Sequence, residues 1–199
     1  RLTKTQNATT STYAYDNIHR LASATNPTES YAYDLVGNRD PLTSAYNNAN
    51  RLLNDGTFTY TYDDNGNLIS KVNISNGETT SYSYDAENQL IRINLPGGAF
   101  VEYAYDGLGR RIQKSLNAVP TTRYVYDNED ILFEYDGFNI LQARYTHGLG
   151  IDEPLIMARG GQSYFYHSDA LGSILNLTDS TGTSVQSYTY DSFGKIIFQ

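Results

Sequence analysis

The sequence predicts an all-β protein in which antiparallel hairpin repeats are wound into a spiral β-solenoid, or shell-like sheet. Three observations support this fold class. A Tyr-x-Tyr-Asp unit recurs along the 199 residues, turn-forming residues follow each unit at a fixed distance, and helical periodicity is convincing nowhere. A repeat of this size is typical of architectures in which each unit stacks on its neighbours. We therefore expect residues 1–199 to form a single domain.

The Tyr-x-Tyr-Asp unit occurs in seven clear repeats and two weaker ones. In the weaker repeats, Ser44 replaces the first tyrosine ahead of Tyr46, and the aspartate that should follow Tyr166 is delayed to Asp169. Tyr145 marks a tenth, eroded repeat. The tyrosines that we assign to the repeat structure are Tyr13, Tyr15, Tyr31, Tyr33, Tyr60, Tyr62, Tyr82, Tyr84, Tyr103, Tyr105, Tyr124, Tyr126, Tyr164, Tyr166, Tyr188 and Tyr190.

Each unit predicts one strand followed by a tight turn. Tyr-x-Tyr places both rings on one face of an extended strand, because side chains alternate along it. An aspartate followed three residues later by a residue that tolerates positive φ fits a type I turn closed by a left-handed residue. The predicted left-handed residues are His19, Gly37, Asn50, Gly66, Asn88, Gly109, Asp130 and Gly194. The turn residues assigned to the repeats are Asp16, Asp34, Gly37, Asp63, Gly66, Asp85, Asn88, Asp106, Gly109, Asp127, Asp169, Gly172, Asp191 and Gly194.

A second strand follows each of these turns and leads into another turn. The second turns are expected at residues 54–56, 76–77, 96–98, 136–137, 160–161 and 180–182. The resulting register places tyrosines opposite leucines and turn aspartates opposite polar residues. The expected pairs are Tyr15 with Leu21, Tyr62 with Leu68, Tyr84 with Leu90, Asp16 with Arg20, Asp63 with Asn67, and Asp106 with Arg110.

Two repeats carry arginine where the others carry an aliphatic residue after the turn, at Arg39 and Arg111. We call this position the leucine slot. At these two positions we expect the guanidinium to lie over the facing tyrosine ring, because cations are attracted to the face of an aromatic ring.

Composition restricts the possible function. The chain has no cysteine, which excludes a disulfide framework and a thiolate metal site. Its net charge of −8 argues against nucleic-acid and anionic-membrane partners. No apolar run approaches the roughly 20 residues that span a bilayer, and the start lacks the apolar core of a secretory signal. Both ends fall between repeat landmarks, so we expect a piece of a longer chain.

Three short motifs suggest chemistry but have simpler interpretations. His167, Ser168 and Asp169 spell a hydrolytic triad, yet adjacent residues of an extended segment point to opposite faces. Residues 63–67 approximate a calcium loop but lack its glycine and closing glutamate at the required offsets. The glycine pairs at 97–98 and 160–161 lack the strand-to-helix context of a phosphate loop. We therefore predict no catalytic residues, no metal and no cofactor.

The tyrosines admit two interpretations. They could form a packed ladder that joins successive hairpins, because neighbouring aromatic rings stabilise each other beyond the area they bury. They could instead present an exposed aromatic track for sugars or peptides. We favour the ladder because the tyrosines recur in every repeat, whereas a binding site usually breaks the repeat locally.

The YxYDxxGR unit, followed by residues 144–155, 164–174, 177–182 and 188–194, closely resembles the YD-repeat (Rhs-repeat) family over essentially the whole chain. Residues 143–199 resemble the Rhs-associated core region of that family. The resemblance implies a spiralling β-sheet, which forms a hollow shell around a cytotoxic domain in bacterial toxins and serves adhesion in animal relatives. The autoproteolytic segment and variable toxin of the family match no residue of this chain.

We therefore expect a non-enzymatic structural protein that forms an extracellular scaffold or a segment of shell wall and self-associates into a fibre or a closed shell. The alternative is an adhesion module that binds carbohydrates or a receptor through tyrosine-lined surfaces. Expected partners are copies of the chain or further repeats of a longer one, together with an enclosed toxin domain or surface glycans. The resemblance implies a bacterial protein that is secreted or lies at the cell surface.

Overall fold

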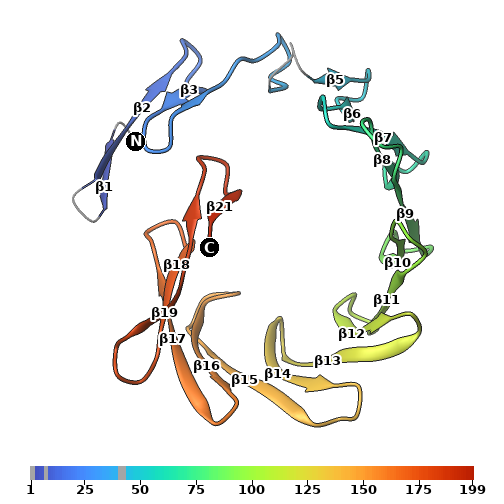
Figure 1. Cartoon of the computed structure of the whole chain (residues 1–199), viewed down its shortest axis with the longest axis vertical. Helices are drawn as coiled ribbons and strands as arrows, with labels where there is room; N and C mark the ends of the chain where they lie inside the picture. Colours follow the sequence, from blue (N-terminus) through green and yellow to red (C-terminus); the bar gives the residue numbers. More distant parts are fainter. Residues whose placement is uncertain (1–2, 7–8, 40–43) are drawn as a thin grey trace.

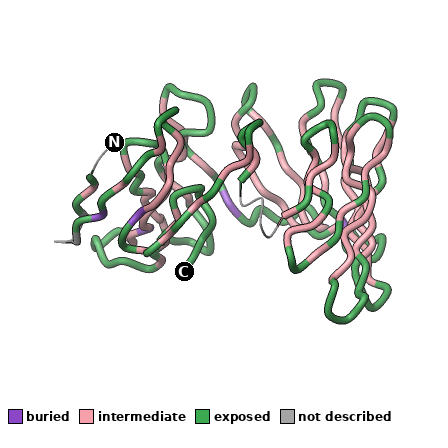
Figure 2. The backbone as a smooth tube through the Cα atoms, turned by 90° about the horizontal axis from the view of Figure 1, so that it is seen from above, coloured by how far each residue is buried: buried purple, intermediate pink, exposed green. Residues whose placement is uncertain are grey.

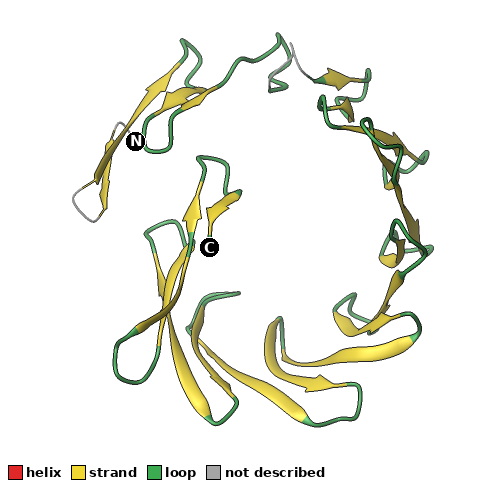
Figure 3. Ribbon diagram, in the orientation of Figure 1, coloured by secondary structure: helices red, strands yellow, loops and turns green. Residues whose placement is uncertain are grey.

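The computed structural model describes residues 3–6, 9–39 and 44–199, and every helix or strand element in them is a β-strand (Figure 3). The first strands are β1 (Thr3–Gln6), β2 (Thr9–Tyr15), β3 (Leu21–Ala24), β4 (Glu29–Ser30), β5 (Ala45–Tyr46), β6 (Leu52–Asn54) and β7 (Phe58–Tyr62). The central strands are β8 (Leu68–Asn73), β9 (Thr79–Tyr84), β10 (Leu90–Asn94), β11 (Phe100–Tyr105), β12 (Arg111–Leu116), β13 (Val119–Asp127) and β14 (Asp130–Asp136). The last strands are β15 (Leu141–His147), β16 (Pro154–Arg159), β17 (Gln162–Ser168), β18 (Ile174–Thr178), β19 (Ser184–Ser187), β20 (Thr189–Tyr190) and β21 (Ile196–Phe198).

Within each sheet the strands pair in chain order, each antiparallel to the next. They form a sheet of four strands (β1–β4), a sheet of fifteen (β5–β19) and a pair (β20–β21). The large sheet curves along its length, so that the chain winds around an open centre and its last hairpin returns towards the first strands (Figure 1). The predicted fold class, an all-β sheet of antiparallel hairpin repeats with a shell-like course, is confirmed.

The register across the turns follows the sequence pattern. Tyr84 pairs with Leu90, and the corresponding pairs in two other repeats are also as predicted. Beside each of these pairs the register shifts by one residue. The repeat of Tyr105 shows the same shift: Tyr105 pairs with Arg111, whereas Ala104 pairs with Gln113. Such a β-bulge bends the strand and increases its twist. Because the bulge recurs from hairpin to hairpin, it contributes to the steady curvature of the sheet.

Seven of the eight positions predicted to be left-handed have positive φ: His19, Gly37, Asn50, Gly66, Asn88, Gly109 and Gly194. The prediction is wrong at Asp130. There β13 continues through Asp127, which pairs with Asp130 as part of the strands, and the chain reverses over Asn128 and Glu129. Asn128 takes the positive φ, 53°, because a two-residue hairpin turn needs it at its first central residue.

The sheet is a single layer. Among the described residues, the buried ones are Ala24, Ala143, Leu177, Ser11 and Ser115, and no large side chain is fully buried (Figure 2). In most repeats the tyrosines are half-buried while the residue between them is exposed, as Ala104 is between its two tyrosines. The tyrosine face is thus covered mainly by its own neighbours. No helix in the described part of the chain is long and apolar enough to cross a membrane.

The first and last hairpins of the chain meet in a contact that we call the seam. Lys4 Nζ lies 3.2 Å from Asp169 Oδ2. Glu29 accepts hydrogen bonds from the backbone N–H of Ser192, at 3.0 Å, and from its hydroxyl. Phe193 packs against Tyr31. These contacts join residues more than 160 positions apart, so the curved sheet is fastened where it returns to its start.

Replacing Gly109 by alanine should lower the free energy of unfolding by about 1–2 kcal/mol, because an added Cβ is strained in the left-handed region and φ is +80° there. Gly107, in the same turn, is the matched control: its φ lies outside that region and no atom lies within 4 Å of an added Cβ. Alanine at 107 should leave stability unchanged or raise it by up to about 1 kcal/mol. Urea unfolding followed by circular dichroism measures both. An equal loss in the two variants would contradict this turn geometry.

Candidate functional site

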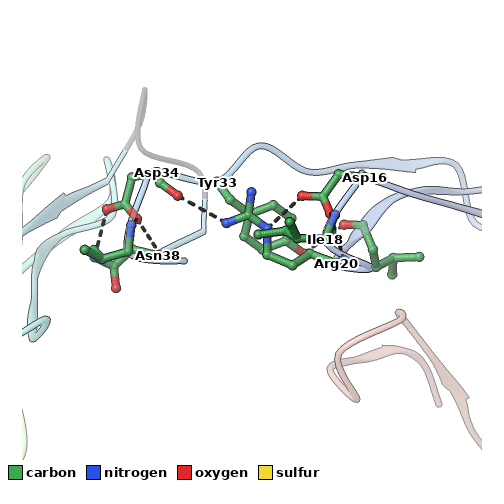
Figure 4. A network of polar contacts seen from close by, with 8 residues as sticks. Asp16, Ile18, Arg20, Tyr33, Asp34 and Asn38 are labelled. Carbon is green, nitrogen blue, oxygen red and sulfur yellow. Dashed lines mark hydrogen bonds and ion pairs between the residues drawn. The ribbon is translucent and has the colours of Figure 1, made fainter.

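The turn aspartates clamp the hairpins. Asp106 Oδ1 accepts the backbone N–H groups of Leu108 at 2.9 Å and Arg110 at 3.0 Å, and its Oδ2 accepts Arg110 Nε at 2.7 Å. Asp16 makes the same three bonds, to Ile18 and Arg20 (Figure 4). A carboxylate therefore satisfies two backbone donors that the turn would otherwise leave open, and it also holds the side chain that closes the turn.

In several repeats the arginine or asparagine that closes the turn also reaches the next repeat. Arg20 Nη1 donates to the carbonyl oxygen of Asp34 at 3.1 Å, and its guanidinium lies 4.5 Å from the ring centroid of Tyr33 (Figure 4). Arg51 makes the same pair of contacts with Asp63 and Tyr62, at 3.0 and 5.4 Å. Neighbouring turns are thus joined by a hydrogen bond and a cation–π contact.

Where asparagine closes the turn, its shorter side chain makes a hydrogen bond to a side chain of the following turn. Asn38 Nδ2 donates to Asn50 Oδ1 at 3.2 Å, and Asn67 Nδ2 donates to Asn88 Oδ1 at 2.8 Å. The acceptor in each case is the side chain of the left-handed residue in the following turn. Asparagine at that position therefore tolerates the positive φ and also accepts the hydrogen bond from the preceding turn.

The tyrosine just before the turn links the strands of successive repeats in seven repeats, whereas the hydroxyl of Tyr166 donates to Met157 Sδ at 3.7 Å. In the seven, the tyrosine hydroxyl donates a hydrogen bond to the backbone carbonyl at the leucine slot of the preceding repeat, next to the β-bulge. The bonds are Tyr33 to Leu21 (2.8 Å), Tyr46 to Arg39 (2.8 Å), Tyr62 to Leu52 (2.8 Å), Tyr84 to Leu68 (3.0 Å), Tyr105 to Leu90 (2.8 Å), Tyr126 to Arg111 (2.9 Å) and Tyr190 to Ile174 (2.6 Å). We call this series the hydroxyl ladder. Phenylalanine could fill the same space but could not form the ladder.

The two arginines in the leucine slot do not lie where the sequence predicts. Arg111 lies over Tyr103, 4.8 Å from its centroid, and Arg39 lies over Tyr31 at 5.4 Å. Each therefore covers the first tyrosine of its pair and not the facing second one. A long side chain on a sheet can reach a diagonal neighbour on the same face, and the second tyrosine is held by the preceding repeat.

Burial and charge shift the ionisation of these groups. Burial raises the pKa of Tyr84 and Tyr105 above the ordinary tyrosine value. Burial, reinforced by the negative charge of Glu134, raises the pKa of Tyr145 to about 12. The Arg110 side chain holds the pKa of Asp106 below its usual value. Tyr84, Tyr105 and Tyr145 are thus neutral and Asp106 is ionised at neutral pH.

The short motifs do not assemble into a reactive site. His167 Nε2 lies 2.9 Å from Thr178 Oγ1. Asp169 instead accepts the N–H groups of Leu171 and Ser173 and pairs with Lys4. In the described ranges, no three histidine, aspartate or glutamate side chains are grouped so that they could hold a metal ion.

The structure shows a groove that the sequence analysis missed. It has a volume of about 520 Å³ and lies between the first hairpins and the last ones, lined by Tyr13, Tyr15, Asp169, Tyr188 and Tyr190 among others. These residues come together only because the sheet returns to its start. The arginine bridges between turns were also missed, although the recurring Asp-x-x-x-Arg spacing at 16–20 and 106–110 could have indicated them.

Replacing Tyr84 by phenylalanine should lower the free energy of unfolding by about 0.5–1.5 kcal/mol, because the carbonyl of Leu68 loses its donor. Tyr82 in the same pair is the matched control, because burial alone raises its pKa and the structure assigns its hydroxyl no partner among the described residues. Phenylalanine at 82 should be close to neutral. Urea unfolding of the three proteins measures the difference, and equal effects at 82 and 84 would remove the ladder from the explanation.

Stability should fall in acid. The carboxyls of Asp16, Asp63 and Asp106 have lowered pKa values in the folded protein, caused chiefly by hydrogen bonds from the residue that closes each turn. Their contribution is therefore present above the unfolded pKa of about 3.9 and is lost as pH falls through the lower folded value. Urea midpoints measured from about pH 6 to pH 3 test this.

The matched variant for the acid experiment is Asp106→Asn. Asn47 shows that an amide oxygen can clamp the same turn, since it accepts the N–H groups of Ala49 and Arg51 at 3.0 Å each. The variant keeps an acceptor but cannot titrate, so its midpoint should depend less on pH than that of the original protein. An unchanged pH dependence would show that other groups dominate.

Comparison with known proteins places this geometry in a family. The family model described as Teneurin YD-shell matches residues 1–199. The tRNA3(Ser)-specific nuclease WapA of Bacillus spizizenii is 32% identical over 176 residues, which covers 83% of this chain and 6% of that protein. The tRNA nuclease WapA of Bacillus subtilis is 34% identical over 176 residues, with the same coverage. The chain thus spans about 6% of the length of these curated relatives.

Two solved structures are similar in part. The crystal structure of TcdB2-TccC3-TEV has a TM-score of 0.44 and 16% identity, covering 95% of this chain and 12% of that one. A Photorhabdus luminescens Tc holotoxin pore has a TM-score of 0.40 and 14% identity, covering 94% of this chain and 15% of that one.

The prediction that the protein is not an enzyme is wrong, because the curated relatives are named as tRNA nucleases. The resemblance to YD-repeat proteins, in contrast, is confirmed by a match that covers every residue. The chain belongs to the teneurin YD-shell family.

Proposed function

We propose that this chain forms a section of the wall of a YD-repeat shell, in a secreted or surface-associated bacterial toxin that acts enzymatically on RNA. One observation carries the wall role: within each sheet the strands pair in chain order, and the chain curves so that its last hairpins contact its first ones. The nuclease activity is proposed for the whole protein, on the names of the WapA relatives.

The single-layer build supports a wall. A globular domain buries one face of each sheet against a second layer, whereas few described residues are buried here. The arginine bridges and the hydroxyl ladder connect successive hairpins in most of the chain without a second layer. Such a sheet can border a hollow interior on one side and solvent on the other. In this proposal residues 1–199 act as one domain, with residues 143–199 as its core region.

The charge of the wall supports a shielding role towards RNA. With a net charge of −8 over the chain, the surface would on average repel a polyanion. We therefore infer that the wall surrounds the enzymatic part of the toxin and separates it from nucleic acid until release. The partners in this proposal are further repeats of the same longer protein and the enclosed enzymatic domain.

One observation favours a second candidate function, the binding of carbohydrate or of a receptor. The groove at the seam is lined by four tyrosines, with Asp169 and Asp191 beside them. Aromatic faces flanked by polar groups suit sugar rings. Binding on a glycan array that is lost when Tyr13 and Tyr188 are replaced by alanine would support this candidate, and silence on the array would remove it.

The wall role can be tested in the longer parent protein. Intact particles should appear hollow by electron microscopy, and tRNA cleavage should be low until protease or mild denaturant opens them. Phenylalanine at Tyr84, Tyr105 and Tyr126 together removes three rungs of the ladder, so these particles should open at lower denaturant. The matched control carries phenylalanine at Tyr82, Tyr103 and Tyr124.

The outcomes separate the two parts of the proposal. Particles without an interior would contradict the wall role. Hollow particles that cleave no tRNA before or after opening would contradict the RNA-directed activity but leave the wall role intact.

A further inference from the structure

The seam contains a socket for an aromatic side chain. The rings of Phe193 and Tyr31 meet edge to face, with centroids 4.8 Å apart and an angle of 80°. The guanidinium of Arg39 lies 4.3 Å from the centroid of Phe193 and 5.4 Å from that of Tyr31. Tyr31 and Arg39 together thus receive an aromatic ring that is carried on the turn of a distant repeat.

A second pair of residues has the same construction. Tyr103 and Arg111 are the first tyrosine and the leucine-slot arginine of their repeat, at the same spacing as Tyr31 and Arg39. Arg111 lies 4.8 Å above the Tyr103 ring. Among the described residues no other aromatic ring packs on the Tyr103 ring or on the Arg111 guanidinium, and Tyr126 contacts Arg111 only through its hydroxyl, which donates to the backbone carbonyl at 2.9 Å. We call this pair the open socket.

The chain also carries a second aromatic side chain presented in the manner of Phe193. Phe193 is held in its turn by a hydrogen bond from its backbone N–H to Asp191 Oδ1, at 2.9 Å. Phe138 has the same bond to Asp136 Oδ1, also at 2.9 Å. Phe193 is 51% exposed although it is seated in the seam, whereas Phe138 is 86% exposed.

The turn that presents Phe138 is fixed in place. A Cβ at Gly137 would lie 2.0 Å from the carbonyl oxygen of Pro120, so the turn is packed closely on the preceding hairpin. An exposed aromatic side chain on a rigid support loses little conformational entropy on binding, and aromatic anchors of this kind dominate many interfaces.

We propose that Phe138 of one copy of this chain docks in the open socket, Tyr103 and Arg111, of a second copy. The contact joins two different surfaces, so each molecule offers one anchor and one socket and copies associate head to tail. This inference deepens the proposed wall role, on which it rests, by naming a second copy as the partner.

The docked contact lacks part of what holds the seam. At the seam, Ser192 beside the anchor donates to Glu29, two residues before the socket tyrosine. At the corresponding positions of the proposed contact stand Gly137 and Val101. The contact rests on the ring and the guanidinium, so it is weaker than the seam, reversible and dependent on protein concentration.

Sedimentation velocity over a range of protein concentrations, at about 0.15 M salt so that the net negative charge is screened, tests the proposal. The original chain should associate as concentration rises. Phe138→Ser and Arg111→Ala should each raise the dissociation constant by about tenfold or more, the effect of losing an anchor residue. Leu108→Ser is the matched control, because Leu108 is 78% exposed at the same turn position but lies in neither surface.

A mixing experiment tests the head-to-tail geometry. The Phe138→Ser chain keeps its socket and the Arg111→Ala chain keeps its anchor. At concentrations below its own raised dissociation constant each should be monomeric alone, while their mixture should form 1:1 dimers and nothing longer. Circular dichroism and urea midpoints equal to those of the original chain establish that both variants are folded.

A monomeric original chain at every concentration would overturn the proposal, as would variants that associate like the original or a mixture that stays monomeric. None of these results bears on the hollow particle or on tRNA cleavage by the parent protein. The failure of this inference and the failure of the proposed function are therefore distinguishable.

Discussion

The hydrogen bond from a tyrosine hydroxyl to the repeat before it, found in seven repeats, is the interaction on which the rest of the structure depends. Backbone pairing alone would give a flexible ribbon of hairpins. The tyrosine hydroxyl reaches the carbonyl beside the bulge, as Tyr105 does at Leu90. It therefore fixes one hairpin against the next at the point where the strand bends. Tyrosine suits this position because one side chain supplies both apolar area and a donor.

The turn aspartates and the ladder act on different parts of the same hairpin. Asp106 closes the turn through backbone donors, and Arg110 extends that clamp into the next repeat. The tyrosine hydroxyls hold the strands of one hairpin against the hairpin before it. A wall one layer thick thus gains from side-chain contacts the cohesion that a globular protein gains from a buried core. This explains why so few described residues are buried while the strands remain regular.

The local structure could be predicted from the sequence because it depends on residues close together in the chain. The pairing of Tyr84 with Leu90 and the positive φ of Gly109 follow from the spacing of tyrosine, aspartate and glycine. Asp130 was mispredicted because a shorter turn competes at the same place. The seam could not be predicted, since Lys4 and Asp169 are 165 positions apart and meet only through the summed curvature of many hairpins. That the relatives are named tRNA nucleases could not be predicted either, because this chain corresponds to about 6% of their length.

The strictly sequential pairing has a mechanical consequence. Almost every contact between strands joins a strand to its neighbour in the chain. A pulling force applied to one terminus therefore acts first on the hairpin at that terminus. Once the seam has separated, hairpins can detach one after another, each at modest force, while those behind them keep their shape. A protein built in this way can be unzipped from an end and drawn out as an extended polypeptide.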